Sequence, residues 1–220
     1  MPKTYPKRKK TKRRYRRKRS SIVRYRKSPV PMRFPTKMRY NDQITLNSGS
    51  GTADSVVIHG NSLYDPITAV GGHQPRGFDQ LMALYDHFVV IGSKITVSFQ
   101  ATSTSANVYV GIAIRDSTTK TTDFNDYMEG GSVVSKPLAL IGATPTVLSI
   151  ATSPRKFLGR SKVMSDPELK GSAAANPAEG YYYHIFCASS NASSDPAAVD
   201  VVLNVDYSAV FIEPKVPAQS

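Results

Sequence analysis

Residues 199–211 read VDVVLNVDYSAVF, and apolar residues occupy every second position of this run. The opposite parity carries mainly Asp, Asn and Ser. The apolar positions are Val199, Val201, Leu203, Val205, Tyr207, Ala209 and Phe211. A period of two sustained over this length predicts a long, half-buried β-strand.

The same alternation recurs along the chain, at 94–100 with Ile95, Val97 and Phe99 and at 107–114 with Val108, Val110, Ile112 and Ile114. Further β-rich runs lie near 43–47, 55–59, 133–141, 146–151 and 181–188, so we expect about eight strands. One short helix is expected at 78–86, leading into a strand over 87–101. The long connections at 60–87, 115–132 and 153–180 favour an eight-stranded antiparallel jelly roll over an immunoglobulin-type sandwich.

Basic residues are concentrated at the N-terminus. Residues 1–40 hold 18 of the 29 Lys and Arg and no acid, whereas the other 180 residues hold 11 basic and 16 acidic residues. The formal charge of +13 therefore divides into +18 and −5. Charge of one sign at this density predicts disorder, so we expect residues 1–40 to be a disordered arm with a Pro-rich linker at 28–40, and residues 41–220 to form the jelly-roll domain.

The cations of this arm need a polyanion, and nucleic acid supplies one. Tyr5, Tyr15 and Tyr25 recur among them, and rings that stack on unpaired bases favour single strands. The alternative is a nuclear localisation signal or a solvated tail alone, and KRKK and KRRYRRKR would serve import as well as phosphate binding. The residues expected to bind nucleic acid are Lys7, Arg8, Lys9, Lys10, Lys12, Arg13, Arg14, Tyr15, Arg16, Arg17, Lys18, Arg19, Arg24, Tyr25, Arg26 and Lys27.

Several other classes are disfavoured. A single cysteine, Cys187, excludes an intrachain disulfide framework, and four dispersed histidines offer no usual metal-ligand spacing, so no cofactor is expected. No run approaches 18 apolar residues and no secretory signal is seen, so we expect a soluble intracellular protein without a membrane span.

The sequence offers little for catalysis. Asp86 and His87 are neighbours in an expected strand and should point to opposite faces, as should Cys187 and His184. We therefore expect no enzyme, and Cys187 to be a buried thiol. Outside the arm, Arg76 and the cluster Arg155, Lys156, Arg160 and Lys162 could contact nucleic acid or form subunit salt bridges, and the sequence does not choose between these.

Two segments resemble a known family. Met1 to Arg8, MPKTYPKR, followed by the Arg/Lys run, resembles the start of the capsid proteins of circoviruses and related small circular single-stranded DNA viruses. Residues 72–99, GHQPRGFDQLMALYDHFVVIGSKITVSF, resemble the stretch before and through their third jelly-roll strand. The matching positions there are Tyr85, Phe88, Ser93, Lys94, Ile95, Val97 and Phe99.

This resemblance implies a virion protein that self-assembles into an icosahedral shell of about 60 copies. It also implies packaging of circular single-stranded DNA and entry into the host nucleus through import receptors. A small RNA virus capsid is the alternative nearest to it. A non-viral nucleic-acid-binding protein with a basic tail, such as a ribosomal protein, is disfavoured by the acidic body. A secreted trimeric jelly-roll ligand is disfavoured by the arm, and a cupin-type enzyme by the missing metal ligands.

Overall fold

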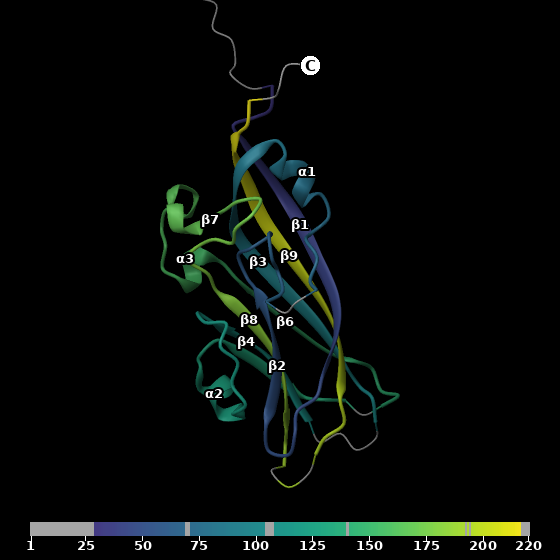
Figure 1. Cartoon of the computed structure of the whole chain (residues 1–220). Helices are drawn as coiled ribbons and strands as arrows, with labels where there is room; N and C mark the ends of the chain where they lie inside the picture. The colour runs from purple at the N-terminus through teal and green to yellow at the C-terminus, as the bar shows by residue number, and fades with distance from the viewer. Residues whose placement is uncertain are drawn as a thin grey trace, which may run out of the picture.

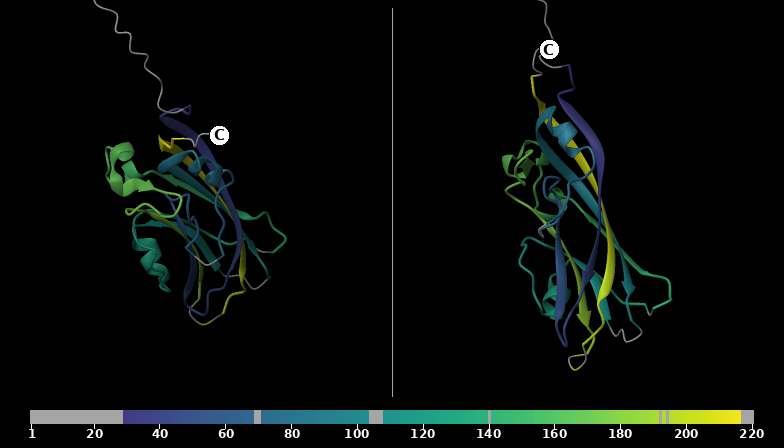
Figure 2. Two further views of the ribbon diagram at one scale, coloured as in Figure 1. Left: turned by 45° about the horizontal axis from the view of Figure 1, so that its top comes forward. Right: turned by 45° about the vertical axis from the view of Figure 1, so that its right-hand side comes forward.

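The computed structural model describes residues 29–68, 71–103, 108–139, 141–191, 193 and 195–216. Two antiparallel sheets pack face to face to form a sandwich (Figures 1 and 2). The strands are β1 (Arg33–Leu46), β2 (Ala53–His59), β3 (Tyr85–Ala101), β4 (Val108–Arg115), β5 (Val133–Pro137), β6 (Thr146–Thr152), β7 (Lys170–Gly171), β8 (Tyr182–Ser189) and β9 (Val199–Pro214). The helices are α1 (Phe78–Met82), α2 (Phe124–Glu129) and α3 (Pro154–Phe157), with 3₁₀ turns at Val163–Ser165 and Pro167–Leu169.

The strand order is that of a jelly roll, which confirms the expected fold class. One sheet runs β1-β9-β3-β6, with the two-residue β7 added beside β3, and the other runs β2-β8-β4-β5. The antiparallel pairs are nested, because β1 pairs with β9, β2 with β8, β3 with β6 and β4 with β5. A long hairpin wrapped around a sandwich has this nesting, and two four-stranded sheets connected in this way are the double-sheet jelly roll.

The core lies between the two sheets, and the alternating run of β9 forms its centre. Val201, Leu203, Val205 and Tyr207 are at most 1% exposed, and they meet the inward residues of the opposite sheet such as Tyr183. Each fully buried side chain of this size stabilises the fold by about 1.5–3 kcal/mol. The thirteen-residue alternation therefore marks the strand that holds the sandwich together.

A buried hydroxyl cluster connects the two sheets. The Oγ of Ser93 in β3 donates to the carbonyl oxygen of Gly60 at 2.6 Å. The hydroxyl groups of Tyr181 and Tyr183 lie 2.8 and 2.9 Å from the same Oγ. Burial raises the pKa of Tyr183 to about 12, so its hydroxyl stays protonated and able to donate.

The expected boundary at residue 40 is wrong, because β1 already begins at Arg33 and the linker expected at 28–40 is largely strand. Met38 and Tyr40 are 6% and 0% exposed. The prolines of this segment suggested a linker, yet β1 is the edge strand of its sheet, where Pro35 can sit without breaking an inner ladder of hydrogen bonds. Residues 33–40 therefore belong to the folded domain.

The remaining expectations agree with the structure in outline. Each of the eight expected β-rich runs overlaps a strand, although β1 begins about ten residues before the run expected near 43–47, and Cys187 is buried. The expected helix at 78–86 is shorter, because β3 begins at Tyr85. The short helices α2 and α3 were not expected, and both lie in connections read only as long loops. Within the described residues, no helix is long and apolar enough to span a membrane.

Candidate nucleic-acid interface

All sixteen residues of the arm expected to bind nucleic acid, Lys7 to Lys27, lie outside the described residues, and their role remains a prediction. The structure does locate the strand that follows them. Arg33, the first residue of β1, pairs with Ile212 near the end of β9, so the described chain begins and ends at the same end of the sandwich (Figure 1). The segment that precedes β1 is therefore joined to the domain at this end of the sheet β1-β9-β3-β6.

The outer side of this sheet is uncovered over most of its length, and we call this surface the open face. At its upper end Val163 and Met164 pack on Val89, Val210 and Ile212, but below them every outward side chain is at least partly exposed. These side chains are Lys37, Arg39, Asn41, Gln43 and Thr45 of β1, Lys94, Thr96, Ser98 and Gln100 of β3, Val147, Ser149 and Ala151 of β6, and Asp200, Val202, Asn204, Asp206 and Ser208 of β9. Short polar groups dominate the face.

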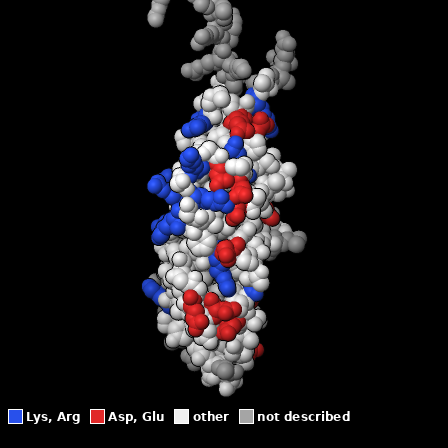
Figure 3. Space-filling model, turned by 90° about the vertical axis from the view of Figure 1, so that its left-hand side faces the viewer, with Lys and Arg blue, Asp and Glu red and all other residues white. Residues whose placement is uncertain are grey.

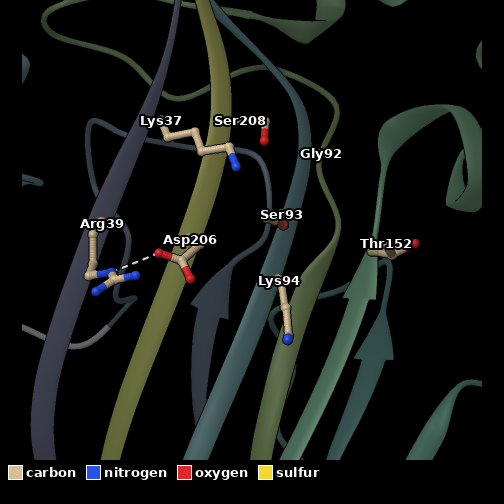
Figure 4. Close-up of a pocket in the computed structure, with 8 residues that line it drawn as sticks. All are labelled: Lys37, Arg39, Gly92, Ser93, Lys94, Thr152, Asp206 and Ser208. Atoms are coloured by element: carbon tan, nitrogen blue, oxygen red, sulfur yellow. Dashed lines mark hydrogen bonds and ion pairs between the residues drawn. The ribbon is translucent and has the colours of Figure 1, made fainter.

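A depression of about 410 Å³ lies where β3 bulges on the open face (Figure 4). The register between β3 and β9 shifts between Val90 and Gly92, so Ile91 is an extra residue in β3. The bulge places Gly92, which has no side chain, opposite Ser208. The depression is lined by Lys37, Arg39, Gly92, Ser93, Lys94, Thr152, Asp206 and Ser208.

The depression is electropositive. Its single carboxylate, Asp206, accepts from the Nε of Arg39 at 2.7 Å, and the Arg39 side chain is 66% exposed. Among the described residues, no carboxylate oxygen lies within 4.0 Å of the amine of Lys37 or Lys94. Three cations therefore surround one carboxylate, and two of them have no ion-pair partner in the described part of the chain.

The outer side of the other sheet, β2-β8-β4-β5, is closed by α2, and we call it the covered face. The ring of Tyr127 in α2 stacks on Phe186 of β8 with centroids 4.5 Å apart and planes 5° apart. Phe186 lies flat over Gly111 of β4, where a Cβ would come within 2.3 Å of the ring. The Tyr127 hydroxyl is 2.8 Å from the Oγ of Ser55 in β2. Aromatic stacking thus seals the centre of this sheet from water.

The segment over the covered face is acidic. Residues 116–130 carry four carboxylates, Asp116, Asp123, Asp126 and Glu129, against one amine, Lys120. On the side of the molecule that carries both α3 and α2, basic side chains gather near the level of α3 and a separate acidic group lies lower, near the level of α2 (Figure 3). The two outer faces therefore differ in charge as well as in cover.

The basic cluster at 155–162 divides into two parts. Arg160 forms ion pairs with Asp166, Glu168 and Glu179, at 3.4, 2.6 and 3.3 Å. All four residues lie in the long connection after α3, so these ion pairs join different parts of that connection. Arg155 and Lys156 lie in α3 and are exposed. The charge of Arg160 is therefore paired within the chain, although its side chain is 36% exposed.

The candidate acid–base pairs do not come together in the described residues. His87 hydrogen-bonds through Nδ1 to Glu213 at 2.9 Å rather than to Asp86. Glu213 also accepts from the Nζ of Lys170 at 2.6 Å, and Lys170 first and His87 second lower the pKa of this carboxyl group. Cys187 faces the core, whereas the Nε2 of His184 on the covered face donates to the carbonyl oxygen of Ser117 at 2.7 Å. No group of three or more His, Cys, Asp and Glu in the described part could hold a metal ion.

Lys37, Arg39 and Lys94 were not expected as site residues. Lys37 and Arg39 were counted with the arm, although their alternation with the apolar Met38 and Tyr40 is the strand signal that could have separated them. In the sequence, Lys94 belongs to the polar side of a strand and to the segment that carries the family resemblance, and neither marks it as a binding residue. The expected jelly roll would place the first and third strands beside the last one, but no local pattern indicates which of their side chains come together.

No family model and no curated protein matches this sequence. Solved structures do resemble it. A chain of Desmodium yellow mottle tymovirus is 14% identical, with 92% of this chain and 99% of that chain covered and a TM-score of 0.41. The semi-empty virus-like particle of the giant freshwater prawn Macrobrachium rosenbergii nodavirus gives 11% identity, coverage of 87% and 100%, and a TM-score of 0.49. The capsid of Penaeus monodon metallodensovirus gives 9%, 89% and 80%, and 0.47.

Proposed function

We propose that this chain is a viral coat protein whose jelly-roll domain tiles an icosahedral shell and whose N-terminal arm packages the genome. The observation that carries the proposal is the union of a nested eight-strand jelly roll with a preceding segment that holds 15 basic residues and no acid at 3–27. A double-sheet jelly roll is one of the folds of viral capsid domains. A polycation joined to it supplies what such a shell needs to neutralise enclosed phosphates.

The charge distribution favours a shell role for the jelly-roll domain and a packaging role for the arm. Residues 29–220 carry 14 basic and 16 acidic residues, so the domain that would form the shell is close to neutral and slightly acidic. Such a surface does not attract nucleic acid strongly as a whole, and the polyanion is drawn to the arm. About 60 arms with 15 cations each would neutralise on the order of a thousand phosphates.

Circular single-stranded DNA is the cargo we propose, on the strength of the sequence resemblance and of the tyrosines spaced through the arm. Rings such as Tyr15 stack on unpaired bases and favour a single strand over a duplex. RNA would satisfy the same electrostatics, so the cargo is distinguished by what purified particles contain. Assembly in the host nucleus follows from the same basic run acting as an import signal.

The proposal is tested by comparing the full chain with a chain of residues 29–220. The shortened chain keeps all of β1, which begins at Arg33, and should fold. If half of the 15 cations engage a single strand, log K against log salt should fall with a slope near −5 for the full chain. The shortened chain should lose most of that slope. Equal binding by both chains, or a shallow slope for the full chain, would make the arm chiefly a targeting signal and contradict the packaging mechanism.

Substitutions within the arm separate the effect of its charge on binding from the effect of its length. Replacing Arg13, Arg14, Arg16, Arg17 and Arg19 with Ala should flatten the salt slope by about 1.8 if half of them contact phosphate and by about 3.5 if all of them do. Replacing Tyr15 with Phe, which keeps a ring, should leave both slope and affinity for single strands close to those of the full chain, whereas Tyr15→Ala should weaken single-strand binding alone. If the five arginine replacements leave the slope unchanged, these residues do not contact phosphate.

A further inference from the structure

We propose that the open face is a second contact with the packaged strand, in which the depression around Lys37, Arg39 and Lys94 takes backbone phosphates. It follows that this face is turned to the inside of the shell and the covered face to the outside. The inference rests on the proposed function, because its occupant is the polynucleotide that the arm packages.

The position of the arm supports this assignment. The arm joins the domain immediately before β1, and Lys37 lies four residues into that strand. At about 3.3 Å per residue, Lys37 is about 13 Å along the strand from Arg33. A strand held by the last cations of the arm is therefore delivered close to the upper end of the open face.

Charge complementarity points the same way. Lys37 and Lys94 have no carboxylate within 4.0 Å among the described residues, and Arg39 shares the only carboxylate of the depression. β1 and β3 flank β9, and Lys37 and Lys94 are offset by two residues because they lie opposite Ser208 and Asp206 of β9. Two strand spacings and this offset separate them by about 12 Å, which lets them contact different phosphates of one strand. An exposed ammonium on a flexible stem binds phosphate as a point charge.

The rest of the open face suits a backbone of any sequence. Most of its other outward side chains are Ser, Thr, Asn and Gln, which supply hydrogen bonds, while Asp200, Val147 and Val202 are the main exceptions and lie away from the depression. The described residues place no large aromatic ring on this face to read or trap a base. The acidic segment 116–130 over the opposite sheet would repel the same phosphates. One side of the sandwich can therefore meet a polyanion, and the other is unsuited to it.

The first test measures binding of a single-stranded oligonucleotide to the full chain and to the double variant Lys37→Ala with Lys94→Ala. Loss of two phosphate contacts should make the salt slope shallower by about 1.4. Relative to 1 M salt, that change corresponds to about 25-fold weaker binding at 0.1 M. The matched control replaces Lys120, in the segment over the covered face, and Lys136 in β5 with Ala, which should leave slope and affinity unchanged.

The outcomes separate the two proposals. A full chain with a shallow slope overturns the proposed function. A full chain with a steep slope, together with a Lys37/Lys94 variant that binds as the full chain does, overturns only the assignment of the open face. Equal loss in the Lys37/Lys94 and Lys120/Lys136 variants also overturns it, because net charge alone would then explain the effect. Circular dichroism of each variant should match the full chain, since all four lysines are exposed.

The second test measures which face is turned inward. Cys187 is 1% exposed, so a single added cysteine can be labelled with little background. In assembled particles Ser149→Cys, on β6 of the open face, should resist a large maleimide-polyethylene glycol reagent, whereas Met128→Cys in α2 should react. Both should react in dissociated subunits. Reaction at position 149 in intact particles overturns the orientation, and so does a Ser149→Cys chain that binds nucleic acid normally but cannot assemble, since the face would then be a subunit contact.

Discussion

The two outer faces of this sandwich differ in their side chains and in their exposure to water. The covered face has a large apolar group, Phe186, and buries it under Tyr127 of a short helix with an acidic surface. The open face has short polar side chains and stays in water, with its cations around one bulge. This difference predicts that substitutions on the covered face affect folding, whereas substitutions on the open face affect the proposed binding of a polyanion.

The largest effect on stability is expected from Tyr127→Ala on the covered face. The change removes a fully buried ring, its stack on Phe186 and a hydroxyl that lies 2.8 Å from Ser55. Loss of a buried aromatic side chain costs about 3–5 kcal/mol of unfolding free energy, measured by denaturant titration of the 29–220 chain. A loss below about 1 kcal/mol would mean that α2 does not seal this sheet in solution.

Acid should weaken the same side of the molecule by the next largest amount. Burial lowers the pKa of His59 in β2 to about 4, and burial also lowers the pKa of His184 in β8. The unfolded chain therefore takes up a proton near pH 6.5 that the folded chain refuses until about pH 4. Stability is then full above pH 6.5 and falls as the pH drops towards 4, by about 3 kcal/mol for His59 alone.

The control for the acid effect is His59→Phe, which keeps a ring of similar shape without a titrating group. Unfolding free energies of the two chains measured from pH 7 to pH 4 should diverge, because the variant lacks the contribution of His59. Parallel curves would show that His59 is protonated in the folded state or is not buried in solution.

The smallest effect on stability is expected on the open face. Lys94→Ala and Thr96→Ala remove exposed or half-exposed side chains that have no ion-pair partner among the described residues. Each should change the unfolding free energy by no more than about 0.5 kcal/mol, while Lys94→Ala weakens polyanion binding. A destabilisation comparable to that of Tyr127→Ala would remove the contrast between the two faces.

The strands could be predicted from the sequence because one face of each meets the core, and burial imposes a period of two. The alternation around Leu203 thus predicted β9 correctly. The boundary at residue 40 failed because Lys37 and Arg39 follow the charge pattern of the arm while Met38 and Tyr40 follow the pattern of a strand. The helix α2 is short, and its stability comes from the Tyr127–Phe186 stack, a contact between residues 59 positions apart that no local pattern reveals.

The electropositive depression could not be predicted from the sequence for a similar reason. Lys37 and Lys94 are brought near each other only because β9 pairs with both β1 and β3. Gly92 reaches the floor of the depression through a bulge at Ile91, which shifts the parity of the strand by one residue. Charges that strand order and register bring together can be located only when the fold is known.

The central claim is that this chain forms a closed shell around a single strand, and the mass of the assembly tests it most directly. Mass photometry of the full chain mixed with circular single-stranded DNA should give one sharp peak at the mass of the shell plus its DNA. For about 60 subunits of 24.0 kDa, the protein part of that mass is about 1.4 MDa. Single subunits, or a broad ladder of chains scattered along the DNA at every salt and protein concentration, would contradict a shell-forming coat protein.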